Sequence, residues 1–144
     1  MRTRLQDTAL LRAADSGREN IIRLLLDKGA HIEGFDKDGY TPLHYAAEWG
    51  QLDIVRLLLE RGASTDVRTN RQDTPLTRAA SSGQEDTLRL LLDNGAKLED
   101  LDENAWASSH FAAQQGHLHI VSLLLERGAF VNLGPDVLEL LSFS

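Results

Sequence analysis

One stretch of sequence, TPLHYAAEWG at residues 41–50, decides the fold of this chain. Thr41 can cap the N-terminus of a helix, and Pro42 is suited to the first helical turn. Leu43 and the two alanines at i+3 and i+4 from it share one helical face, where small side chains let another helix approach closely. Gly50 ends the helix, because glycine adopts a positive φ at little cost. The stretch therefore predicts a short amphipathic helix with a buried alanine face.

The residues after Gly50 predict a second helix that runs back along the first. Asp53 falls in its first turn, where a carboxylate interacts favourably with the helix dipole, and Gly62 is suited to a left-handed cap at its end. The helix carries an apolar arc made of Ile54, Val55, Leu57, Leu58 and Leu59. Because one neighbour cannot cover so wide an arc, we expect this helix pair to be packed on both flanks.

These features recur along the chain with a step of 33 residues. The first series of glycines is Gly17, Gly50, Gly83 and Gly116, and a Gly-Ala pair begins at Gly29, Gly62, Gly95 and Gly128. Paired alanines and triple leucines keep the same step. A unit of this length cannot bury its apolar arc alone, so the four units must stack and share their cores. The sequence therefore predicts a solenoid.

This repeating pattern resembles the ankyrin repeat. The resemblance is clearest in the second unit, which reads Asp36-x-x-Gly39-x-Thr41-Pro42-Leu43-His44-x-Ala46-Ala47, then Gly50, Ile54-Val55 and Leu57-Leu58-Leu59-x-x-Gly62-Ala63. It implies an all-α ankyrin-repeat solenoid of stacked helix-turn-helix units with projecting β-hairpin-like loops. We expect one domain over residues 1–144, with repeats at about 3–35, 36–68, 69–101 and 102–134 and a C-terminal cap at 135–144.

The other three units depart from the pattern of the second, and the first reads Thr8-Ala9-Leu10-Leu11. The third has Thr69 and Gln72 at the positions of Asp36 and Gly39, and we expect its loop to differ locally. The fourth reads Ala-Ser-Ser-His at 107–110 where the second reads Thr-Pro-Leu-His. Because this change removes a core leucine, residues 103–115 are predicted to open most easily.

Composition and charge exclude several classes of function. The chain of 144 residues is 42% apolar and 26% charged, as expected of one folded domain. It has no cysteine, which excludes disulfides and thiolate metal sites and favours an intracellular, cytoplasmic or nuclear location. The net charge of −7 disfavours a nucleic-acid partner. No apolar run approaches membrane-spanning length, so we expect no membrane partner either.

The residue types needed for catalysis do not form a recognisable constellation. The histidines are His31, His44, His110, His117 and His119. The resemblance implies structural hydrogen bonds for His44 and His110, which occupy equivalent positions in their units. His117 and His119 are two residues apart and would point to different sides of a helix, which disfavours a shared metal ion. We therefore expect no enzymatic activity, no metal and no cofactor.

The candidate site is the surface that remains after the core positions are subtracted. It comprises the exposed face of the first helix of each unit together with the loop tips, which in ankyrin repeats resembles the concave binding surface. Aromatic side chains gather there, and tryptophan, tyrosine and arginine are the commonest interface hot spots. The predicted partner-binding residues are Tyr40, Tyr45, Glu48, Trp49, Arg71, Asp73, Arg78, Ser82, Trp106, Phe111, Gln114 and Gln115.

The resemblance implies a non-catalytic protein–protein interaction module, a scaffold or adaptor, that binds a partner protein while itself monomeric. An alternative is that the aromatic rings only pack against adjoining loops and stiffen the stack. Two other classes of function stay open. The chain could be a structural, self-associating module that pairs through residues 137–143, or a regulatory fragment of a larger multidomain protein.

Overall fold

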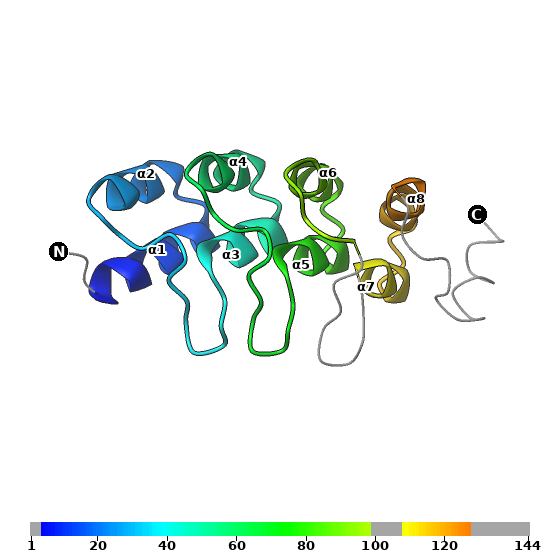
Figure 1. Ribbon diagram of the computed structural model, residues 1–144, viewed down its shortest axis with the longest axis horizontal. Helices are drawn as coiled ribbons and strands as arrows, with labels where there is room; N and C mark the ends of the chain where they lie inside the picture. Colours follow the sequence, from blue (N-terminus) through cyan, green and yellow to red (C-terminus); the bar gives the residue numbers. More distant parts are fainter. Residues whose placement is uncertain (1–3, 99–107, 128–144) are drawn as a thin grey trace.

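The computed structural model describes residues 4–98 and 108–127. These residues form four consecutive helix pairs: α1 (Arg4–Ser16) and α2 (Glu19–Asp27), α3 (Pro42–Trp49) and α4 (Leu52–Glu60), α5 (Pro75–Ser81) and α6 (Glu85–Asp93), and α7 (Ser108–Gln114) and α8 (Leu118–Glu126). The odd-numbered helices form one layer and the even-numbered helices a second layer above it (Figure 1). None of the described residues forms a strand. The predicted all-helical solenoid is therefore confirmed, whereas the predicted cap at 135–144 lies outside the described residues.

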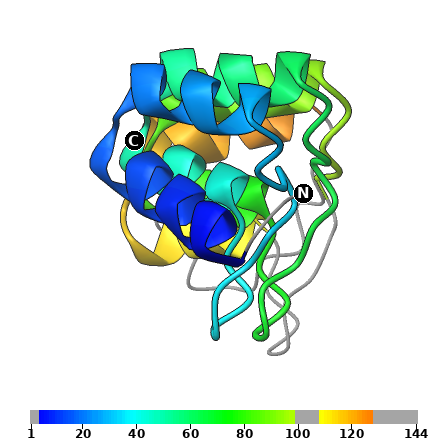
Figure 2. The same cartoon turned by 90° about the vertical axis from the view of Figure 1, so that its left-hand side faces the viewer.

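The loops between helix pairs project to one side of the stack. Seen along the stack, the loops that lead into α3 and α5 hang side by side below the odd-numbered helices (Figure 2). These loops have the outline of hairpins but are held by turns. The side predicted to be the concave surface is therefore bounded by one row of helices and one row of loops.

The α3 helix begins and ends as its sequence predicts. The Thr41 side chain accepts a hydrogen bond from the backbone N–H of His44, and the Thr41 N–H donates to Nδ1 of His44 over 3.1 Å, so the two residues cap the helix reciprocally. Gly50 ends the helix with φ of 67°. A Cβ at Gly50 would meet only the flexible end of the Gln84 side chain, which can shift, so the backbone conformation is what favours glycine there.

The first helix starts earlier than the repeat pattern predicts. The equivalent of Thr41 is Thr8, but α1 already begins at Arg4. The reason lies in the next position, where Ala9 replaces Pro42. Proline disfavours a helical conformation of the residue before it, whereas alanine lets the helix continue upstream.

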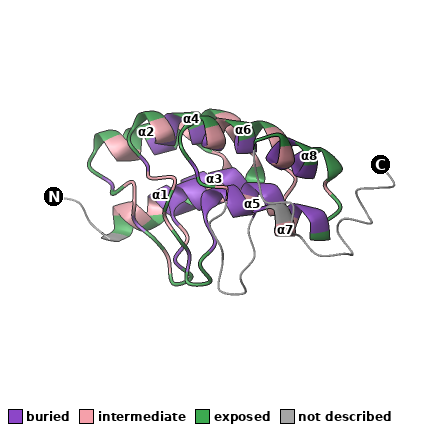
Figure 3. Cartoon of the chain, turned by 45° about the vertical axis from the view of Figure 1, so that its right-hand side comes forward, coloured by how far each residue is buried: buried purple, intermediate pink, exposed green. Residues whose placement is uncertain are grey.

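The core runs between the two helix layers and from one unit to the next (Figure 3). In α3, Leu43, Ala46 and Ala47 are buried, and this helix packs between α1 and α5. In α4, four residues of the predicted apolar arc are buried and Leu59 is partly buried; the four are Ile54, Val55, Leu57 and Leu58. Complete burial of each large aliphatic side chain stabilises the fold by about 1.5–3 kcal/mol.

The first unit shows what happens to the arc when no unit precedes it among the described residues. Ile21 and Leu24 of α2 are 49% and 56% exposed. Their equivalents in α4, Ile54 and Leu57, are each only 2% exposed, because the first unit covers them. The core of each unit is therefore completed by its neighbour, as expected for a solenoid.

His44 connects the core to the projecting loops. Its side chain is fully buried, and Nε2 lies 3.0 Å from the backbone oxygen of Asp73 in the next loop. Since Nδ1 accepts from Thr41 N–H, this network requires the neutral tautomer with the proton on Nε2. Burial lowers the pKa of His44 to about 4. The structural role implied for this histidine by the resemblance is thus confirmed by its contacts.

The loop of the third unit has the same turn as the loop of the second, so the expected local difference is wrong. Asp36 accepts from the backbone N–H groups of Asp38 and Tyr40, and the Thr69 hydroxyl accepts from the equivalent groups two and four residues on. Gly39 has φ of 81°, and Gln72 adopts φ of 68° at the equivalent position. Turn geometry therefore overrides the side-chain preference of Gln72.

We expect Gln72→Gly to raise the free energy of unfolding by about 1 kcal/mol, because it relieves a left-handed conformation that disfavours a Cβ. Urea titration would measure the change. The matched variant is Gly39→Ala, whose new Cβ would lie 2.7 Å from the backbone nitrogen of Asn70 and should destabilise the fold. If Gln72→Gly were no more stable than the parent protein, the backbone at Gln72 would not be strained and the prediction would be wrong.

We also expect His44 to make stability depend on pH. The unfolded state binds a proton near pH 6.5 but the folded state only near pH 4, so acidification favours unfolding across this interval. Between pH 7 and pH 4 the contribution lost should be roughly 2–3 kcal/mol. His44→Gln, which cannot titrate, is the control, and carboxylate titrations common to both proteins cancel. A stability difference between the two proteins that stays constant with pH would refute the assignment.

Candidate functional site

The exposed face of α3 carries the centre of the predicted site. Trp49 is 55% exposed, and Tyr45 and Glu48 are half-buried on the same face. The indole Nε1 of Trp49 donates to Oδ1 of Asp15 over 2.7 Å, and Asp15 belongs to α1 of the preceding unit. The largest exposed ring on this face is therefore held in one orientation by a neighbouring unit.

Tyr45 connects α3 to the loop before it. Its hydroxyl donates to the carboxylate of Asp36, and its ring centroid lies 4.9 Å from that of Tyr40. Burial, followed by the hydrogen bond to Asp36, raises the pKa of Tyr45, and burial also raises the pKa of Tyr40. The two phenols therefore stay neutral across the physiological range and help to fix the loop against the helix.

Arg78 of α5 is engaged within the molecule. It contacts Glu48 at 3.1 Å and Asp73 at 3.4 Å, and its side chain is only 19% exposed. Asp73, predicted at a loop tip, is instead 6% exposed, and its backbone oxygen lies beside His44. The described contacts of Arg78 and Asp73 thus join two units and a loop.

The other predicted residues are spread along the same side of the stack. Arg71 is exposed in the loop before α5, and Ser82 is half-buried at the end of that helix. Phe111 is half-buried in α7, with Gln114 and Gln115 exposed at its end. Trp106 lies outside the described residues. The structure thus pairs Tyr40 with Tyr45 and Glu48 with Arg78, and Tyr45, Glu48 and Trp49 share one face of α3. Phe111, Gln114 and Gln115 lie two units further on.

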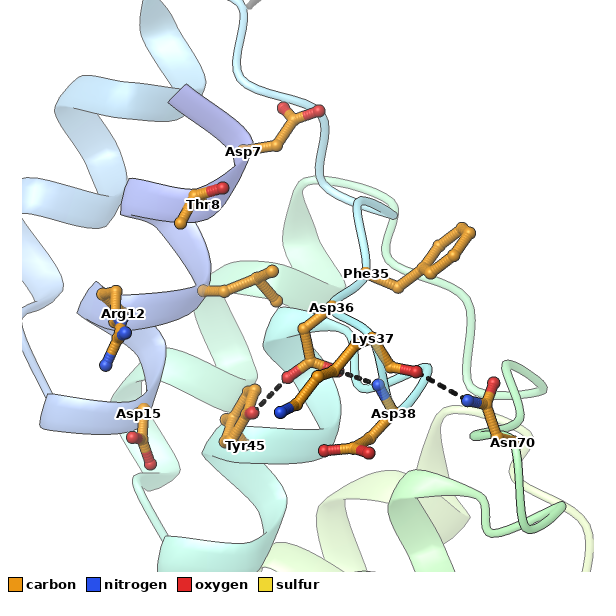
Figure 4. A pocket seen from close by; sticks show the side chains of 11 residues that line it. Asp7, Thr8, Arg12, Asp15, Phe35, Asp36, Lys37, Asp38, Tyr45 and Asn70 are labelled. Atoms are coloured by element: carbon orange, nitrogen blue, oxygen red, sulfur yellow. Dashed lines mark hydrogen bonds between the residues drawn. The ribbon is translucent and has the colours of Figure 1, made fainter. Parts of the chain in front are cut away.

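A groove of about 690 Å³ opens between α1 and the loop that leads into α3. Figure 4 shows Asp7, Thr8, Arg12 and Asp15 on the α1 side and Phe35 to Asp38 on the loop side, with the Phe35 ring at the outer edge, directed away from α1. Tyr45 lies at the base of the groove, where its hydroxyl donates a hydrogen bond to Asp36. Asn70 of the next loop lies at the edge of the groove far from α1. The Asn70 side chain donates to the Lys37 backbone oxygen over 2.7 Å, which joins the two loops.

Several residues of this groove were not predicted from the sequence, above all Phe35. Its ring is 71% exposed, which makes it the most exposed aromatic side chain among the described residues. The sequence did contain a signal for Phe35. The equivalent position in the third unit is Arg68, so the repeat does not require an aromatic residue there, and a phenylalanine at this position indicates an exposed ring. Asp7 occupies the position of Tyr40, Asp73 and Trp106, which were all predicted, so the repeat also offered a signal for Asp7. Asp36 was assigned to the repeat pattern and not to the site.

The chemistry of the described residues offers no metal centre. No group of three or more histidine, aspartate or glutamate side chains in residues 4–98 and 108–127 lies close enough to hold an ion. The Nε2 atom of His117 lies 3.1 Å from the backbone oxygen of Ser81, within hydrogen-bonding distance of the preceding unit. The described part of the chain also contains no helix of the length and apolarity needed to cross a membrane.

We expect the two tyrosines, which are the only ones in the chain, to resist ionisation in the folded protein. At pH 10 an unfolded chain should have about half of its phenols ionised, whereas the folded protein should show much less tyrosinate absorbance. Alkaline titration with and without urea would measure this, with Tyr45→Phe identifying the contribution of Tyr45. Coincident folded and unfolded titration curves would contradict the packing described for both rings.

Comparison with known proteins agrees with this architecture. No curated protein matches the sequence. The family model for ankyrin repeats in three copies matches residues 1–69 and again residues 62–134. Those two matches extend over all four helix pairs, and their stacked cores, capped first helices and projecting loops have been described above. The chain belongs to the ankyrin repeat family.

Proposed function

We propose that this chain binds a partner protein through the concave surface formed by its odd-numbered helices and projecting loops, and that it acts as a non-catalytic scaffold or adaptor. Ankyrin repeats are generally protein–protein interaction modules and are typically non-catalytic. A repeat fold does not specify its ligand, so the argument for this surface depends on its own residues.

Trp49 is the observation that carries the proposal. A tryptophan that is more than half exposed is unfavourable on a soluble surface unless something covers it. Here the indole is also held in place by Asp15, which reduces the entropy lost when a partner covers the ring. Exposure and preorganisation together are the properties expected of an interface hot spot.

The even-numbered helices of the described chain carry no tryptophan, tyrosine or phenylalanine side chain. Even-numbered helices expose ion pairs such as Arg56–Asp53 at 3.3 Å and Arg61–Asp27 at 2.9 Å. Solvent-exposed pairs of this kind contribute little to stability and are ordinary features of a solvated surface. The contrast favours the concave side as the binding surface.

A second candidate is self-association through the first unit. Ile21 and Leu24 remain exposed there, although their equivalents in α4 are buried by a preceding unit. The same face could be covered by another helix pair, in a second copy or in a larger protein. Sedimentation over a concentration series, with Ile21→Lys/Leu24→Lys as the comparison, distinguishes this candidate from a monomeric adaptor.

We expect Trp49→Ala to weaken partner binding by about thirtyfold, because truncation of an interface tryptophan typically costs at least 2 kcal/mol. Quantitative affinity capture with the full chain would compare Trp49→Ala with Arg89→Ala on the opposite face. The same captured proteins should be lost with the first variant and kept with the second. Capture that survives Trp49→Ala but is lost with Arg89→Ala would place the interface on the other side of the molecule.

A further inference from the structure

The groove between α1 and the first loop carries an excess of negative charge. Four carboxylates line it, against the two cations Arg12 and Lys37; the four are Asp7, Asp15, Asp36 and Asp38. Two of them come from one helix and two from the facing loop (Figure 4). A partner that enters the groove therefore meets carboxylates on both walls.

Neutral hydrogen-bond donors hold three of these carboxylates in place. Asp15 accepts from the Trp49 indole, and Asp7 accepts from the His31 backbone N–H over 2.7 Å. Asp36 accepts from two backbone N–H groups and from Tyr45. The donors to Asp15 and Asp36 carry no charge, unlike Arg78, which pairs with Glu48, so they position the oxygens without neutralising them. Asp15 and Asp38 form no ion pair with another described residue.

The groove also presents an apolar surface at its loop side. Phe35 is 71% exposed there, and Leu11 contributes to the lining from α1. Pockets that hold small ligands typically measure roughly 300–1,000 Å³, so a groove of about 690 Å³ has room for the side chains of a few residues. No three or more ligating side chains of the described residues come together to hold a metal ion. Separate cationic groups are therefore the partners that fit these carboxylates.

We propose that this groove binds a segment of the partner protein that carries lysine or arginine side chains next to an apolar residue. The cationic groups pair with Asp15 and Asp38 on the two walls, and the apolar side chain packs against Phe35. The inference rests on the proposed function, because it names the partner chemistry for one part of the concave surface. Charge complementarity of this kind also accelerates association and selects against acidic partners.

The test selects binding peptides from a random 12-residue display library against the full chain, and measures their affinities by fluorescence polarisation. Asp15→Asn/Asp38→Asn removes two charges from the groove while the amide oxygen at position 15 can still accept from Trp49. Asp53→Asn/Asp86→Asn removes the same charge from α4 and α6, outside the groove. Phe35→Ser removes the exposed ring without touching the core. Thermal unfolding confirms that each variant is folded.

We expect the selected peptides to be rich in lysine and arginine with an adjacent apolar residue. Their binding should weaken about tenfold in Asp15→Asn/Asp38→Asn and in Phe35→Ser, less than twofold in the control variant, and progressively with added salt. Enrichment of acidic or uncharged peptides, affinities unchanged by the groove variants, or no enrichment at all would overturn the inference.

The same selection separates this inference from the proposed function. Peptides that lose affinity with Trp49→Ala but not with the groove variants would refute the basic-segment inference and leave the concave surface as the interface. Selected peptides that are insensitive to all of these variants but weakened by Arg89→Ala would refute both.

Discussion

Stacking of one helix pair on the next is the interaction on which the rest of this structure depends. The buried alanines of α3 let it approach α1 and α5 closely, and the arc of α4 is covered only because a preceding unit is present. Ile21 and Leu24 occupy the positions of Ile54 and Leu57 in the first unit, and they are exposed because no described unit precedes that unit. Stability in such a chain is a sum of contributions within units and between neighbours.

The stack also determines the shape of the concave surface. His44 is buried in one unit and hydrogen-bonded to the backbone of the next loop, so the loops are attached to the core rather than free to adopt many conformations. Asn70 joins neighbouring loops through its contacts with Asp38 and Lys37. A surface built from connected loops and rigid helices is preorganised, which reduces the entropic cost of binding a protein partner.

Polar contacts divide the concave surface into two parts with different chemistry. Around α5, Arg78 pairs with both Glu48 and Asp73 within the molecule. Around α1, carboxylates are held by N–H and O–H donors that carry no charge. The first arrangement connects units, whereas the second leaves a field that a cationic partner can use.

The sequence by itself determined the helix pairs, their caps, the alanine core and the stacking of units, because each depends on local propensity and on a period of 33 residues. Local residue types were a poorer guide where backbone geometry prevailed, as in the left-handed Gln72 and the early start of α1. Only the tertiary structure decided that Trp49 meets Asp15, that Asp73 is buried, and that Phe35 borders a groove. The physical reason is that a repeat constrains the positions that pack between units, whereas the neighbours of a surface residue depend on how helices and loops from different units come together in space.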